Sequence, residues 1–319
     1  MNETPSTLLE AITYFSTGDN AHNFIVQMRW PKGVCCPRCQ SQDVRFITSR
    51  KIWECKSCTK QKQFSVKVGT IMEDSPIPLS KWLAAFWLIA NAKNGVSSYE
   101  IHRALGITQK SAWFLLQRIR LAMQTGTFLK FKGQVEADET FIGGKARNMH
   151  KEAKDRKIRG GTGGTGKEIV LGLLERHGKD GHSVVRTIHI QSQRRSTIDP
   201  TVRENVEVGS EVFTDALSSY SKLTPEFRHQ FVDHAEQYVN GQVHTNGLEN
   251  FWSLLKRSIK GTYVSVEPFH LFRYLDEQAF RFNRRGLNDG ERFNHVCEGM
   301  TGKRLTYSRL TGKENELLA

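Results

Sequence analysis

Three stretches of alternating apolar character decide the fold: QVEADETFIGG at residues 134–144, KEIVLGLLER at 167–176 and HSVVRTIHI at 182–190. A period of two predicts β-strands, and their succession predicts an antiparallel meander. Further along, the sequence predicts a helix, a strand, a candidate fifth strand and a second helix at IDPTVRENV (198–206), EVFTDALSSY (211–220), HQFVDHA (229–235) and TNGLENFWSLLKRSIKG (245–261). We therefore expect an α/β domain.

Three acidic residues stand on separate elements of this domain. Asp138 lies in the first strand, Asp215 ends the strand after the first helix, and Glu249 lies early in the last helix. Carboxylates gathered in this way repel one another, and divalent cations relieve the repulsion. Lys256 follows Glu249 by nearly two helical turns, so the two side chains share a face. The pattern favours a metal-dependent nuclease centre, from which strand alternation directs Glu139 away.

The charge balance points to a polyanionic partner. The chain of 319 residues has 46 lysines and arginines against 33 acids, a net charge of +13, which favours nucleic acid. Residues 145–167 are the most basic stretch, so we expect Lys145 and Arg147 to follow DNA phosphates, with a solvated surface loop as the alternative. No apolar run approaches the roughly 18 residues of a membrane span. The N-terminus resembles no secretory signal, so we expect a cytoplasmic location and no membrane partner.

Four of the six cysteines form two closely spaced pairs, CPRC at 36–39 and CKSC at 55–58. This is the spacing of a zinc ribbon, in which each pair directs two thiolates at one ion. We therefore expect a structural Zn²⁺ site made by Cys36, Cys39, Cys55 and Cys58. Four thiolates leave no open coordination position, so catalysis by this zinc is not expected.

The region after the cysteines has the pattern of a helix-turn-helix unit. SSYEIHRAL at 97–105 begins with a capping serine, and QKSAWFLLQRIRLAM at 109–123 follows after a glycine turn. In such a unit the second helix reads DNA with its N-terminal residues, here Gln109, Lys110 and Ser111. A three-helix unit that never contacts DNA is the alternative.

Basic residues near the acids are further candidates for DNA contact. Lys256 and its neighbour Arg257 lie at the end of the helix that carries Glu249. Arg281, Arg284 and Arg285 form a stripe at helical spacing, which is either a solvated face or a surface that grips DNA.

These motifs together resemble the DDE transposases of bacterial and archaeal insertion sequences, in the ISXO-like group that carries an N-terminal zinc ribbon. The resemblance covers the chain from residue 20 to about residue 290. It rests on the two cysteine pairs, DETFIGGK at 138–145, TDALSSY at 214–220, HTNGLENFWSLLKRSIKGTY at 244–263 and YLDEQAFRFNRR at 274–285.

The resemblance implies a ribonuclease H-like catalytic domain, whose order is three strands, helix, strand, helix, strand and helix. It implies cleavage and strand transfer at the terminal inverted repeats of a mobile element, with two Mg²⁺ or Mn²⁺ ions held by Asp138, Asp215 and Glu249. Asn246 is an alternative third member of the set. Lys256 would bind a DNA phosphate, and cutting two ends of double-stranded DNA implies a homodimer or higher oligomer.

We expect four segments along the chain. They are an N-terminal helix and zinc ribbon at 1–72, a helix-turn-helix DNA-binding domain at 73–130, the catalytic domain at 131–290 and a C-terminal tail at 291–319. The alternative function is a catalytically silent DNA-binding regulator. Such a protein would be expected to lack one of the three acids, and none is missing here.

Overall fold

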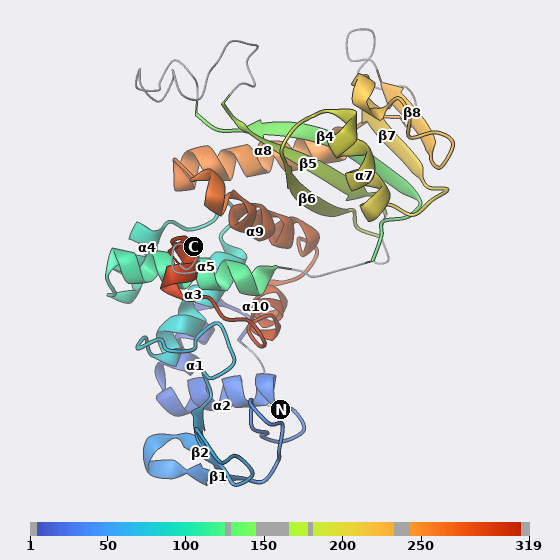
Figure 1. Cartoon of the computed structure of the whole chain (residues 1–319). Helices are drawn as coiled ribbons and strands as arrows, with labels where there is room; N and C mark the ends of the chain where they lie inside the picture. The colour runs from blue at the N-terminus through green and yellow to red at the C-terminus, as the bar shows by residue number, and fades with distance from the viewer. Residues whose placement is uncertain (1–4, 125–128, 145–165, 178–180, 233–242, 314–319) are drawn as a thin grey trace. The chain divides into compact units, whose positions relative to one another are not determined.

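The chain divides into two compact units in the computed structural model (Figure 1). Unit 1 joins residues 1–125 to residues 287–319, and unit 2 comprises residues 126–286. The structure describes residues 5–124, 129–144, 166–177, 181–232 and 243–313. The segments 1–72 and 73–130, expected as separate domains, therefore fall mostly within one unit.

The cysteine-rich part of unit 1 is a small antiparallel sheet in the order β1-β2-β3, with β1 at Val44–Ile47, β2 at Ile52–Cys55 and β3 at Gln63–Ser65. Trp53 on β2 is the centre of its apolar side. Its ring stacks on His22 and Phe64 and meets Trp30 edge-on. This aromatic packing joins the ribbon to α2 (Gly18–Arg29), because His22 lies on that helix.

The remaining elements of unit 1 are helices: α1 (Leu8–Ser16), α3 (Leu79–Asn91), α4 (Ser98–Leu105), α5 (Gln109–Met123), α10 (Asp289–Glu298) and α11 (Tyr307–Leu310). The apolar run at 82–90 lies in α3, where most of its side chains are buried. The expected cap of α4 is present as a capping box, in which Ser97 accepts from the Glu100 amide and Glu100 accepts from the Ser97 amide. Thr108 caps α5 with a single hydrogen bond, in which its hydroxyl accepts from the Ser111 amide.

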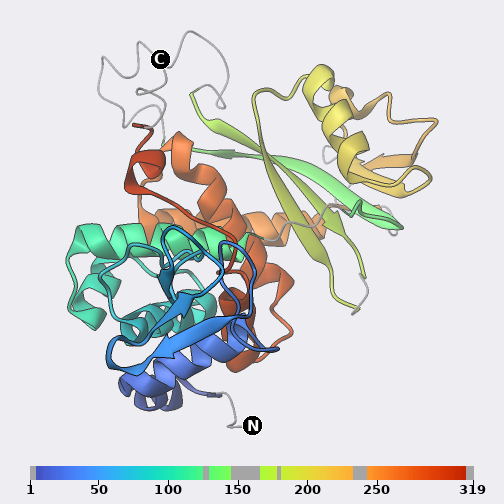
Figure 2. The ribbon, with the colours of Figure 1, turned by 60° about the horizontal axis from the view of Figure 1, so that its bottom comes forward.

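The C-terminal segment is not the tail that the sequence predicts. Phe293 on α10 is fully buried and packs against Phe15 on α1, Phe24 on α2 and Trp87 on α3. Figure 2 shows the red C-terminal segment lying among the blue and teal N-terminal helices. Aromatic burial of this kind contributes about 1.5–3 kcal/mol per side chain. Residues 287–313 are therefore an integral part of unit 1.

Unit 2 is built on a five-stranded sheet in the order β6-β5-β4-β7-β8, comprising β4 (Gln134–Ile142), β5 (Glu168–Glu175), β6 (Val184–Ile190), β7 (Glu211–Asp215) and β8 (Arg228–Val232). The first three strands form the predicted antiparallel meander, and β7 and β8 run parallel to β4. All five predicted strands are present.

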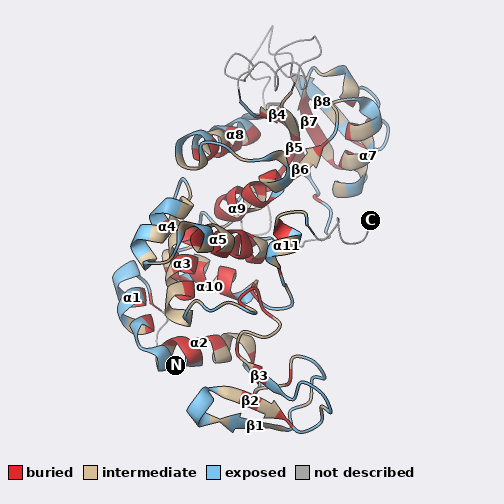
Figure 3. Ribbon diagram, turned by 60° about the vertical axis from the view of Figure 1, so that its left-hand side comes forward, coloured by how far each residue is buried: buried red, intermediate tan, exposed pale blue. Residues whose placement is uncertain are grey.

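Two apolar clusters cover the two faces of this sheet. Val135 and Ala137 on β4 belong to the cluster that includes α7 (Arg195–Asn205). The opposite cluster joins β5 to α8 (Asn246–Ser258) and α9 (Leu271–Asn283). Figure 3 shows the buried residues gathered in the central strands and on one side of α8 and α9. The helix expected between the fourth and fifth strands is reduced to a 3₁₀ turn, Ser218–Tyr220.

Two short irregular segments connect α8 to α9: a π-helical turn at Ile259–Tyr263 and a 3₁₀ turn at Pro268–His270. Within the described parts of the chain, every helix is too short or too polar to cross a membrane.

Candidate active site

Asp138 lies near the middle of the central strand β4, on the face covered by α8. The indole Nε1 of Trp252, from α8, donates to Asp138 Oδ2 at 2.8 Å. Gly172 on β5 stands directly opposite Asp138, and a Cβ there would lie 2.5 Å from the Trp252 ring. A larger residue would therefore push the indole away from the carboxylate.

Asp215 is the last residue of β7, the parallel neighbour of β4. The paired register ends at Glu136 and Phe213, two residues before Asp138 and Asp215 on their strands, and Asp215 lies within electrostatic reach of Asp138. The Leu217 amide donates to Asp215 Oδ1 at 3.1 Å, which fixes the carboxylate at the end of the strand.

Glu249 and Lys256 occupy the first and last turns of α8, as the sequence predicts. Glu249 is exposed and Lys256 is half-buried. Both lie within electrostatic reach of Asp138. Burial, the nearby Asp215 and Glu249 raise the pKa of Asp138 to about 6, against the opposing effect of the Trp252 hydrogen bond. The fold thus places Asp215, Glu249 and Lys256 around Asp138, each within electrostatic reach of its carboxylate.

The carboxylate set fits a hard divalent cation, because such ions take oxygen ligands and relieve like-charge repulsion. The acid oxygens are not drawn together as tightly as the cysteine sulfurs. Among the described residues, the four cysteines are the one group of three or more ligands whose atoms all lie within 4.8 Å of one another.

Asn246, the alternative third member, is the first residue of α8 and is exposed. Its backbone amide donates to His244 Nδ1 at 3.4 Å. Thr245 precedes the helix without making a side-chain cap. Both residues lie in the first turn of α8, and Glu249 alone of the two brings the negative charge that a hard cation favours.

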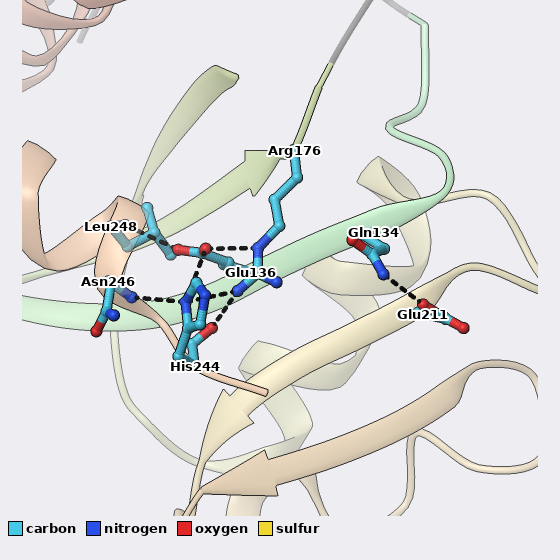
Figure 4. A network of polar contacts seen from close by, with 7 residues as sticks. All are labelled: Gln134, Glu136, Arg176, Glu211, His244, Asn246 and Leu248. Carbon is cyan, nitrogen blue, oxygen red and sulfur yellow. Dashed lines mark hydrogen bonds and ion pairs between the residues drawn. The ribbon is translucent and has the colours of Figure 1, made fainter. Parts of the chain in front are cut away.

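A buried acid replaces the missing cap. Glu136 on β4 is 1% exposed, and its Oε2 accepts from the Leu248 amide in the first turn of α8 at 2.9 Å. Arg176 donates to the other oxygen at 2.7 Å and also to the carbonyl of His244 at 2.6 Å (Figure 4). A Cβ on Gly247 would lie 2.8 Å from Glu136, so glycine lets the carboxylate reach the helix end. This network fixes the start of α8, one residue before Glu249.

Glu139 points to the other face of β4, as alternation predicts, and there it accepts a hydrogen bond from Tyr220. Tyr220 is fully buried and belongs to the turn that follows Asp215. Burial, together with Asp215 and Asp138, raises the pKa of Glu139 to about 7, against the opposing effect of the Tyr220 hydrogen bond. Glu136 and Glu139 therefore connect β4 to the two segments that carry the other acids: Glu136 bonds to α8, which carries Glu249, and Glu139 bonds to the turn after Asp215. No local sequence pattern predicts either contact.

These raised pKa values predict how stability depends on pH. The folded protein retains protons on Asp138 and Glu139 that the unfolded chain loses, so the free energy of unfolding should fall as pH rises from about 4 to about 7. A bound divalent cation should oppose that fall. We expect Mg²⁺ to raise the thermal midpoint more at about pH 8 than at about pH 5. Asp138→Asn should reduce this difference, and an equal effect of Mg²⁺ at both pH values would contradict the assignment.

The predicted DNA-contacting residues have varied surroundings. At the start of α5, Gln109 donates to the Ser98 hydroxyl, Ser111 bonds with Thr108, and the exposed Lys110 lies 4.8 Å from the Tyr307 ring. These contacts leave Lys110 as the most accessible of the three. Lys145 and Arg147 lie outside the described residues.

The prediction that Arg281, Arg284 and Arg285 form one exposed stripe is wrong for Arg281. Arg281 is buried and forms an ion pair with the fully buried Glu277, four residues earlier on α9, so it does not face solvent. Arg284 is half-buried, and the exposed Arg285 donates to the carbonyls of Ser183 and Phe282. Arg257 is exposed on α8 and keeps its predicted position.

The four cysteines in the ribbon converge as predicted, and their sulfurs lie within 4.8 Å of one another. Such a cluster suits tetrahedral zinc. Cys297, by contrast, is fully buried on α10.

Removal of zinc should unfold the ribbon in unit 1 without affecting the stability of unit 2. A zinc chelator should abolish the ordered near-ultraviolet signal of the ribbon, because Trp53 packs on the sheet that carries the cysteines. The thermal transition of unit 2 and its response to Mg²⁺ should remain. Cys39→Ser should mimic chelation, whereas Cys35→Ser is the matched control. Loss of both transitions together would contradict independent metal sites.

Comparison with known proteins decides the family. The ISXO2-like transposase domain model matches residues 130–283, and the transposase zinc-ribbon domain model matches residues 16–61. The chain is 32% identical over 100 residues to an uncharacterized transposase-like protein of Haemophilus influenzae, across 31% of this chain and 80% of that protein. The chain belongs to the ISXO2-like transposases.

A second relative of this ISXO2-like transposase spans most of the chain. It is an uncharacterized protein in transposable element ISH50 of Halobacterium salinarum, 26% identical over 284 residues, across 86% of this chain and 92% of the relative. These matches confirm the family that the sequence motifs predict. They also confirm the N-terminal zinc-ribbon domain. Both matched regions contain the predicted metal ligands, which are the cysteines in one and the acids in the other.

Proposed function

We propose that this transposase binds the terminal inverted repeats of its mobile element and catalyses metal-dependent DNA cleavage and strand transfer. The observation that carries the proposal is the placement of three acids from distant segments: Asp138 on the central strand, Asp215 at the end of the neighbouring parallel strand, and Glu249 on the helix whose Trp252 donates to Asp138. We further propose that unit 2 is ribonuclease H-like. Its strand order β6-β5-β4-β7-β8, with an acid on the first strand and another at the end of the fourth, supports that fold.

The three acids would hold the catalytic Mg²⁺ or Mn²⁺ ions. Two such ions would activate an attacking water or 3′-hydroxyl and stabilise the leaving oxygen. The Trp252 indole holds Asp138 in one orientation, and the Glu136 network holds the helix that carries Glu249. Lys256, on the same helix, would bind a phosphate of the substrate strand as a point charge.

The N-terminal unit would recognise the element ends. The exposed Lys110 at the start of α5 presents a cationic side chain to solvent, and Arg45 of the ribbon is exposed while paired with Glu54. Since two ends are cut together, we propose that the active form contains at least two protomers. The Cys₄ cluster would hold Zn²⁺ and stabilise the ribbon.

A cleavage assay tests this function. The inverted repeats in the DNA that flanks the gene supply the substrate, and the full-length protein is incubated with it in Mg²⁺ or Mn²⁺. We expect strand cleavage at the repeat ends and none with a scrambled duplex. Specific binding without cleavage in either metal would contradict the proposal and favour a DNA-binding regulator.

A further inference from the structure

A cavity of about 350 Å³ lies within unit 1, between the zinc ribbon and the first turns of α2 and α3. Three of the side chains that line it can carry positive charge: His22 on α2, Lys51 before β2 and Lys67 after β3. Among the described residues, none of those that line the cavity is acidic. A lining of this charge favours an anionic ligand.

The start of α3 faces the cavity without a side-chain cap. Its N-cap residue is Pro78, whose ring offers no hydrogen-bond acceptor, and Leu79 and Ser80 of the first turn line the cavity. The first backbone amides of a helix have no partner within it, and they stand at the positive end of the helix dipole. Oxyanions, phosphate above all, bind to such amides.

Lys67 lines the cavity and forms no ion pair with any acid that the structure describes. Its Nζ donates to the carbonyls of Ser75 and Ile77 at 2.8 and 2.7 Å, which fixes the segment that leads into α3. An ammonium group has three protons to donate, so one remains for a ligand. Burial and, to a smaller extent, the nearby Arg118 lower the pKa of Lys67. A bound anion would offset both effects.

His22 supplies a buried polar atom that is independent of the helix start. Only 7% of the residue is exposed, and its ring stacks on Trp53 with the centroids 5.4 Å apart. Its Nε2 is buried and has no hydrogen-bond partner in the described parts of the chain. Buried polar atoms are rarely left in this state, because the loss of water is then not compensated. With a proton on Nε2, the ring would donate to an oxyanion.

The exposed side of the cavity leaves room for a ligand. Lys51 pairs there with Asp19, which is 70% exposed and does not belong to the lining. Exposed ion pairs contribute little to stability, so the Lys51 ammonium can also serve a ligand. Gly18, the first residue of α2, is exposed in the lining, and a Cβ there would meet no atom within 4 Å.

We propose that this cavity binds one phosphate group of the DNA backbone. The first amides of α3, Lys67 and His22 would contact its oxygens, and Lys51 would add positive charge. A phosphate of DNA is favoured because Lys60 and Lys62 of the same ribbon are also exposed and would follow the strand on either side. The inference rests on the proposed function and deepens it, since it gives unit 1 a fixed phosphate contact that orients the element end.

Gly18→Asp tests the site by adding a carboxylate to the lining. The side chain has space, and aspartate suits the first turn of a helix, so the thermal midpoint should not fall. Binding of the full-length protein to a fluorescent duplex of the element end is measured by anisotropy across a salt series. Gly18→Asp should reduce the slope of log K against log salt by about 0.9, the contribution of one phosphate contact. Thr13→Asp adds the same charge at an exposed position of α1 outside the lining and should leave the slope unchanged. Equal slopes for wild type and Gly18→Asp would overturn the proposal.

Neutral methylphosphonate linkages, placed singly at successive positions of the duplex, identify the phosphate. At one position the linkage should reduce the slope of the wild-type protein by about 0.9 and leave that of Gly18→Asp unchanged. The same response of both proteins at every position would overturn the proposal. Inorganic phosphate that raises the thermal midpoint of the wild-type protein but not of Gly18→Asp, with equal DNA slopes, would assign the cavity to free phosphate instead. Absence of cleavage by the wild-type protein, with the binding differences intact, would count against the proposed function and not against this site.

Discussion

Asp138→Asn is expected to reduce strand cleavage at the element ends by more than about 100-fold. Removing a group that only supports a metal ligand reduces activity by up to about 100-fold, and loss of a ligand itself should cost more. The substitution keeps the shape of the side chain and an acceptor for the Trp252 indole, but it removes the charge that would hold the metal. Binding to the inverted repeats should stay within about threefold of wild type at moderate salt, because phosphate contacts by lysine and arginine dominate DNA affinity.

The same assay tests the other members of the set. Asp215→Asn and Glu249→Gln should cause comparable losses, and Asp199→Asn is the matched control, because Asp199 pairs with Arg203 on the opposite face of the sheet. Asn246→Ala decides the identity of the third ligand. Full cleavage by Glu249→Gln together with none by Asn246→Ala would assign that position to Asn246. Retained cleavage by the Asp138→Asn variant would contradict the assignment of Asp138, Asp215 and Glu249 as the ligands of the catalytic metal ions.

Glu136→Ala is expected to lower the free energy of unfolding by about 3–5 kcal/mol, because it leaves the buried Arg176 guanidinium without its carboxylate. It also removes the acceptor for the Leu248 amide at the start of α8. The measurement is urea unfolding of the full-length protein, followed by tryptophan fluorescence.

A control residue, Glu211, lies on the neighbouring strand β7 in the same view (Figure 4). Glu211 accepts from the Gln134 side chain at 3.0 Å but is partly exposed, so Glu211→Gln should change stability by no more than about 1 kcal/mol. Glu136→Gln keeps the shape of the side chain and should recover part of the stability. Equal effects of the Glu136→Ala and Glu211→Gln substitutions would contradict the role of Glu136 as the tie between β4 and α8.

The sequence predicted the parts of the site that depend on local pattern. Asp138, Asp215 and Glu249 could be assigned to elements because apolar alternation and helical spacing are visible within ten or so residues. The antiparallel meander of β4, β5 and β6 follows from the close succession of three such strands, and the direction of Glu139 away from Asp138 follows from the alternation.

Contacts between distant segments could not be predicted in this way. The partners of Glu136 are Arg176 and the Leu248 amide, and no local pattern relates them. Phe293 packs against N-terminal helices that lie more than 200 residues before it in the sequence, so no local pattern shows that the C-terminal segment is more than a tail. Arg281 is different, because Glu277 stands four residues before it and signals a helical ion pair that the stripe hypothesis overlooked.

The central claim is that Asp138, Asp215 and Glu249 jointly hold the catalytic cations, and anomalous diffraction tests it most directly. A crystal of the full-length protein with Mn²⁺ and an element end should show a manganese peak at about 2.1 Å from the oxygens of Asp138 and Asp215, which is the distance typical of small hard cations. Glu249 should complete the site. Well-ordered carboxylates with no manganese peak among them, at a metal concentration that supports cleavage, would contradict the account.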